Sequence, residues 1–116
     1  MQSPTYTLYE YDWSSARDTF DSMGYKLLSL VDESEPYEVD QTAIYLTPQG
    51  KFAYASASGC SCWGGDWTVS DFDSLDEIEE TFLKEDIHMY NPSMKGFRSL
   101  MAEAREAFDN SGQQAT

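Results

Sequence analysis

Basic residues are scarce in this sequence, and histidine and cysteine are nearly absent. Seven Lys and Arg stand against 21 Asp and Glu, which gives a formal net charge of −14. Nucleic-acid binding needs cationic side chains that displace counterions, and anionic membranes attract basic segments, so the composition argues against both partners. The single histidine, His88, excludes any site that needs two.

The sequence also lacks the usual marks of an enzyme or an exported protein. It has no glycine-rich nucleotide-binding loop, no Gly-x-Ser-x-Gly nucleophile motif and no His-Glu-x-x-His metal-binding motif. We therefore expect no enzymatic activity and no cofactor. No apolar run approaches the ~20 residues of a membrane helix. Residues 1–4 show no basic region followed by an apolar stretch, so no signal peptide is expected. Two cysteines are too few for a secreted disulfide scaffold, and we therefore expect a cytoplasmic protein with reduced thiols.

What is present predicts one folded domain. The chain has 116 residues, of which 41% are hydrophobic and 15% aromatic. This length and composition suit a single hydrophobic core. We expect one domain over residues 1–110, followed by a polar, frayed tail over 111–116.

Hydrophobic periodicity predicts five strands and three helices. A polar, acidic loop is expected between the second and third strands, at 32–41. A Ser-x-x-Glu capping box, Ser74 with Glu77, predicts the start of the second helix, whose apolar stripe includes Leu83. Pro92 is expected at the first position of the last helix. The strands are expected at 5–11, 25–31, 42–46, 51–58 and 67–72, and the helices at 14–23, behind Ser74, and from Pro92 onward.

A β-hairpin is the clearest local signal in the chain. Pro48 suits the first central position of a type I turn, and Gly50 accepts the left-handed conformation that follows it. On the returning strand, Phe52 and Tyr54 share one face, whereas alanines at 53, 55 and 57 share the other. That small-residue face should be covered by a closely packed helix. Together these features predict an α+β fold: a small antiparallel sheet with a central hairpin, packed against about three helices on one face.

The acidic residues form two clusters in the sequence, and the last helix carries Lys95, Arg98 and Arg105 instead. One interpretation is a solvated face that keeps the protein soluble. The other is a surface that imitates a phosphate backbone and attracts the basic surface of a DNA-binding protein. Candidate partner-binding residues are Asp71, Asp73, Asp76, Glu77, Glu79 and Glu80 from one cluster, which extends to Asp86, and Asp32, Glu33 and Glu35 from the other.

A loop rich in glycine and cysteine, residues 58–67, is the least ordinary segment. Its two thiols are expected to be small buried hydrophobes beside inward-turned tryptophans. A metal site is the alternative, with Cys60, Cys62, Asp66 and His88 as candidate ligands. A structural zinc site normally has two pairs of closely spaced ligands, however, and this sequence has only one. A disulfide between the two cysteines would close a small strained ring and be labile.

Residues 45–54 (YLTPQGKFAY) and 58–63 (SGCSCW) resemble small uncharacterised acidic proteins encoded by bacteriophages of actinobacteria, over roughly residues 42–80. The resemblance implies a phage product made in the host cytoplasm, a class in which inhibitors of host enzymes or defence systems and DNA mimics occur. We therefore expect a non-enzymatic protein that binds a host protein with a basic surface, with its oligomeric state open. The alternative is a small metal- or redox-responsive module built on Cys60 and Cys62.

Overall fold

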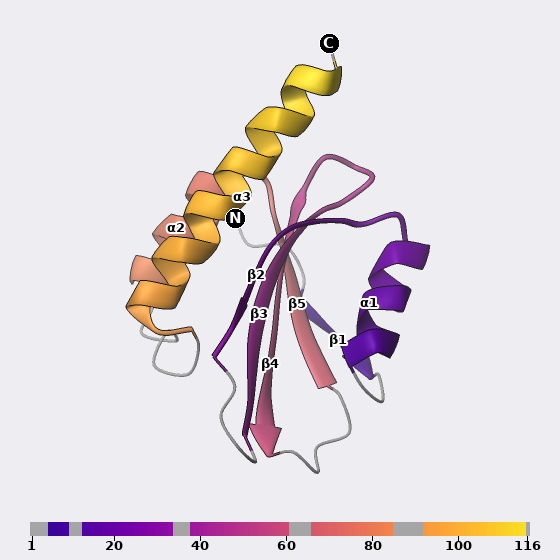
Figure 1. Ribbon diagram of the computed structural model, residues 1–116, viewed down its shortest axis with the longest axis vertical. Coiled ribbons are helices and arrows are strands. Elements are labelled where there is room, and N and C mark those ends of the chain that lie inside the picture. Colours follow the sequence, from indigo (N-terminus) through magenta and orange to yellow (C-terminus); the bar gives the residue numbers. More distant parts are fainter. Residues whose placement is uncertain (1–4, 10–12, 34–37, 61–65, 85–91, 116) are drawn as a thin grey trace.

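The fold is an antiparallel sheet with helices packed against it (Figure 1). The computed structural model describes residues 5–9, 13–33, 38–60, 66–84 and 92–115. This confirms the α+β class predicted from the sequence. In chain order the elements are β1 (Thr5–Tyr9), α1 (Trp13–Ser22), β2 (Lys26–Asp32), β3 (Glu38–Leu46), β4 (Phe52–Cys60), β5 (Asp66–Phe72), α2 (Leu75–Lys84) and α3 (Met94–Ala115).

The sheet has the strand order β1-β5-β4-β3-β2, and every neighbouring pair is antiparallel. The predicted hairpin lies at its centre, where Leu46 of β3 pairs with Phe52 of β4. Gly50 has a φ of 83° and its N–H donates to the Thr47 carbonyl at 3.0 Å. The Thr47 hydroxyl accepts the Lys51 N–H at 3.0 Å, which closes the turn. The turn residues therefore act as the sequence predicts.

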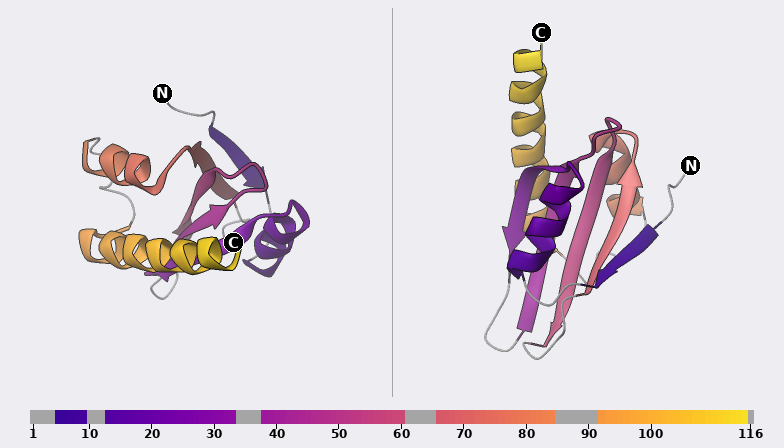
Figure 2. Two further views of the ribbon diagram at one scale, coloured as in Figure 1. Left: turned by 90° about the horizontal axis from the view of Figure 1, so that it is seen from above. Right: turned by 90° about the vertical axis from the view of Figure 1, so that its right-hand side faces the viewer.

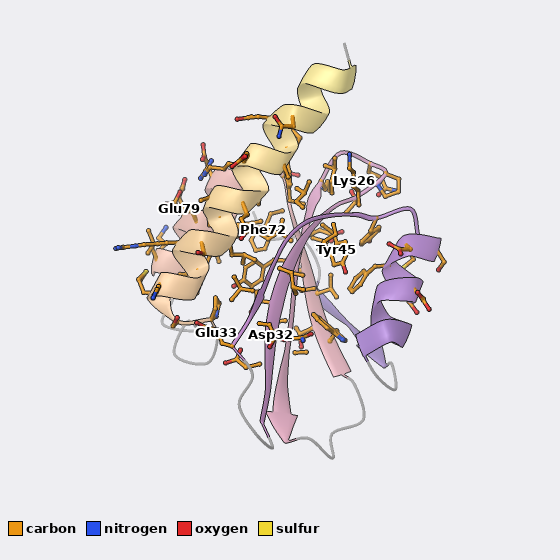
Figure 3. The ribbon with its side chains drawn as sticks, viewed as in Figure 1. Lys26, Asp32, Glu33, Tyr45, Phe72 and Glu79 are labelled. Carbon is orange, nitrogen blue, oxygen red and sulfur yellow. The ribbon has the colours of Figure 1, made fainter. Side chains whose placement is uncertain are left out.

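The helices cover both faces of the sheet, which differs from the single covered face expected from the sequence. Figures 1 and 2 show α1 on one side of the strands and α2 with α3 on the other. Alternate residues of a strand point to opposite faces. Accordingly Tyr45 lies toward α1, and Phe72 lies toward α2 and α3 (Figure 3). Each face has its own hydrophobic core because each carries an apolar set of residues.

The core under α1 combines small and aromatic side chains. Phe20 of α1 is fully buried over the alanine face of the hairpin and stacks on Tyr45 with ring centroids 4.3 Å apart. Trp67 of β5 meets Phe20 edge-on at 6.2 Å. This packing confirms the expectation that a helix covers the alanine face. The rings fit there because the alanine side chains are small and leave room for them. The alanines of this core are Ala43, Ala53, Ala55 and Ala57.

The core under α2 and α3 is larger and more conventional. Phe82 of α2 stacks on Phe97 of α3 at a centroid distance of 3.7 Å. Leu83, which the sequence pattern placed in the buried stripe, is 56% exposed, because Phe82 already occupies the position that faces the sheet. The other buried residues of this core are Leu28, Ile44, Phe52, Phe72, Leu75, Ile78, Leu100, Met101 and Ala104.

Three expected boundaries are corrected by the structure. β3 begins at Glu38, inside the predicted loop, because residues 38–41 pair with the far end of β4. α3 begins at Met94 rather than Pro92, since the Ser93 hydroxyl caps it by accepting the Gly96 N–H at 3.0 Å. The same helix continues to Ala115, where a frayed tail was expected from residue 111.

Candidate functional site

The start of α2 is built by the predicted capping box. The Glu77 N–H donates to the Ser74 hydroxyl at 3.1 Å. The Glu77 carboxylate returns to accept the N–H of Asp73 at 3.1 Å, one residue earlier than the usual arrangement. Acids in a first helical turn are also favoured by the helix dipole. Glu77 therefore has a structural role in addition to its charge.

Arg105 of α3 neutralises part of the acidic charge of α2. Its guanidinium contacts the carboxylates of Asp76 at 2.9 Å and Glu79 at 2.8 Å. The spacing of three residues places both acids on one side of α2, where α3 lies. The Arg105 side chain is 41% exposed, so each contact contributes little to stability, in the range of ~0–1 kcal/mol. The positive charge of Arg105 thus offsets part of the repulsion between the carboxylates of α2.

Two further members of the acidic run lie at the hairpin end of the sheet. Asp73 pairs with Lys51 at 3.1 Å. Asp71 is opposite Ala53 in the sheet, so it faces the α1 side, away from α2. Burial raises the pKa of the Asp71 carboxyl, against the opposing effect of Lys51, and its Oδ1 atom is buried without a hydrogen bond. Asp71 therefore does not join the exposed carboxylates on α2.

Two described acids of the second predicted cluster, Asp32 and Glu33, make hydrogen bonds within the protein. Asp32 accepts a hydrogen bond from the Gln41 amide at 3.0 Å. The carboxylate of Glu33 accepts the Ser93 N–H at 2.8 Å and the Ser93 hydroxyl at 2.6 Å, so it lies against the first turn of α3 (Figure 3). Glu33 is thus committed to holding α3, a role that the sequence pattern did not reveal because Ser93 is 60 residues away.

Among the acids that the structure describes, Glu33 and Asp73 lie beside different parts of α3. Glu33 lies at Ser93, whereas Asp73 lies near Phe108, farther along α3. At 1.5 Å per residue these two positions on α3 are ~22 Å apart. The structure therefore favours the α2 cluster as the candidate binding surface: Asp73, Asp76, Glu79 and Glu80, which we call the α2 acidic face.

A shallow hollow of about 440 Å³ borders the α2 acidic face. It lies where the hairpin turn, the start of α2 and the later part of α3 meet. Two of its lining residues, Phe108 and Asp109, were not singled out as site residues from the sequence. Only the packing of α3 against the start of α2 brings them beside Asp73. The remaining lining residues are Gly50, Phe52, Ser74, Leu75, Asp76 and Arg105.

The candidate metal loop lies mostly outside the described residues. Cys62 and His88 fall there, as does Glu35 of the second acidic cluster, and the side chains of Cys60 and Asp66 are not described either. Over the described ranges, no three His, Cys, Asp or Glu side chains are arranged to hold a metal ion. The metal and redox alternative stays a prediction.

No helix within the described part of the chain is long and apolar enough to cross a membrane. Comparison with known proteins yields no matching protein family, no matching curated protein and no matching solved structure.

Proposed function

We propose that this is a non-enzymatic binding protein, phage-encoded and acting in the host cytoplasm, whose α2 acidic face docks onto a basic surface of a host protein. The observation that carries the proposal is the exposed set of carboxylates on α2 and at its start. Asp73 is 69% exposed and Asp76 is 78% exposed, and Glu80 is exposed on the next turn. A net charge of −14 exceeds what solubility requires of a small domain.

The electrostatics suit a partner that normally binds DNA. A concentration of like charge on a rigid helix attracts a basic groove and accelerates association. The ion pairs with Lys51 and Arg105 hold three of the carboxylates in place without removing the excess of negative charge. An inhibitor that imitates DNA in its charge is the form of this function that we favour.

Two charge reversals on opposite faces of the sheet test the proposal. Glu80→Lys alters the α2 acidic face, and Asp21→Lys makes the same change of charge on α1; both residues are exposed. Immobilised protein is exposed to an actinobacterial lysate at low and raised salt. We expect the original chain and Asp21→Lys to capture the same basic DNA-binding protein, which salt or added duplex DNA releases, and Glu80→Lys to capture much less. Equal capture by both variants, or no salt-sensitive partner, would overturn the proposal.

A further inference from the structure

The hollow beside the α2 acidic face has an apolar floor with one ring open to solvent. Phe52 and Leu75 are 5% and 6% exposed, whereas Phe108 of α3 is 38% exposed. Phe108 packs edge-on against Phe52 with centroids 5.1 Å apart, which holds its ring in place. The floor therefore offers aromatic surface that nothing in the described residues fully covers.

Carboxylates dominate the charge around this floor. Asp73 and Asp76 are already paired, with Lys51 at 3.1 Å and Arg105 at 2.9 Å. Both pairs are exposed, so they cost little to rearrange when another cation arrives. Asp109, one residue beyond Phe108, makes no ion pair within the part of the chain that the structure describes. Three carboxylates, Asp73, Asp76 and Asp109, thus line the hollow together with one cation, Arg105.

From this combination we infer that the hollow receives an arginine side chain from a basic segment of the partner. The inference rests on the proposed function and names the group that the α2 acidic face would anchor. A guanidinium stacks on an aromatic ring and binds a carboxylate through two parallel hydrogen bonds, and its alkyl stem covers apolar surface. Phe108 and Asp109 offer these two partners side by side. An acidic segment would meet like charge, and a neutral apolar segment would leave the rim carboxylates partly desolvated.

Titration with hexa-arginine, followed by the amide NMR signals of the labelled protein, tests the inference. We expect saturable shifts at Gly50, Asp73, Phe108 and Asp109, and smaller effects from hexalysine, which lacks the planar group. Phe108→Leu keeps an apolar contact with Phe52 but removes the aromatic face. We expect this variant and Asp109→Asn each to weaken binding about threefold to tenfold at low salt. Asp18→Asn, on α1, is the matched control and should leave the affinity within about twofold.

The following outcomes of the titration would overturn the inference. Shifts spread over both faces would mean unspecific attraction to an acidic protein. Shifts in the hollow that depend on protein concentration alone would indicate a second copy, and equal affinity of all variants would remove Phe108 and Asp109 from the contact. The lysate experiment separates the two proposals. If Phe108→Leu and Asp109→Asn still capture the partner fully while Glu80→Lys does not, the proposed function stands and the arginine site fails.

Discussion

Replacing Gly96 with alanine is expected to destabilise the protein, although alanine is the better helix former. In an ordinary helical position the change would stabilise by ~0.5–1 kcal/mol. At Gly96, however, the added methyl carbon would lie 2.7 Å from Oε2 of Glu33 and 2.9 Å from its carboxyl carbon. The carboxylate would have to move, and it would then lose its two hydrogen bonds from Ser93.

The expected magnitude follows from these opposing effects. Hydrogen bonds to a charged group contribute ~1.5–3 kcal/mol each when sheltered, and less at a partly exposed site such as this one. Taking ~1 kcal/mol for each bond to Glu33, the loss exceeds the gain in helix propensity, and Gly96→Ala should cost about 1 kcal/mol. In a Glu33→Ala background no carboxylate is displaced, so the same substitution should stabilise by ~0.5–1 kcal/mol.

Urea denaturation of the four chains in this double-mutant cycle measures the difference. We expect a coupling free energy of about 1.5–2 kcal/mol between positions 33 and 96. Ser93→Ala provides a control, because it removes the hydroxyl that both caps α3 and donates to Glu33. If Gly96→Ala stabilised both backgrounds equally, the contact between Glu33 and the first turn of α3 would play no part in stability.

Three further substitutions, together with one control variant, test the packing and electrostatics. Phe20→Ala should lower the free energy of unfolding by ~3–5 kcal/mol in denaturant titrations, because this fully buried ring covers the alanine face; a loss below 1 kcal/mol would contradict that role. Thr42→Val should leave stability unchanged or raise it by about 1 kcal/mol, since the buried Thr42 hydroxyl has no hydrogen bond. Thr47→Val, the control, should lower the free energy of unfolding by ~1–2 kcal/mol because the Thr47 hydroxyl accepts the Lys51 N–H. Similar effects of the two threonine variants would refute the distinction between a hydroxyl with a hydrogen bond and one without. Asp71→Asn should raise the melting temperature at neutral pH, because burial raises the pKa of the Asp71 carboxyl and so disfavours its charged form in the folded state. Since a carboxyl with a raised folded pKa regains stability as pH falls through that pKa, the advantage of asparagine should shrink in melts at acidic pH, and an advantage that grows toward acid would show the opposite sign.

The local elements of this protein could be predicted from residue patterns alone. The pattern around Pro48 and Gly50 predicted the central hairpin, and Gly50 has the positive φ that the turn requires. The spacing of Ser74 and Glu77 predicted the start of α2. These features could be predicted because the residues that form a turn or a helix cap lie within a few positions of one another in the sequence.

The side of the sheet that each helix covers, and the charges that form ion pairs, depend instead on how distant segments pack. An apolar stripe shows which side of a helix is buried, but either sheet face can bury it, so the placement of α1 opposite α2 and α3 was not readable. Arg105 meets Asp76 and Glu79 only because α3 packs beside α2. Glu33, which looked like part of an exposed acidic cluster, instead binds Ser93, a contact across 60 residues of chain. Composition fixes how many charges a protein carries, whereas the packing of distant segments fixes which of them stay available to a partner.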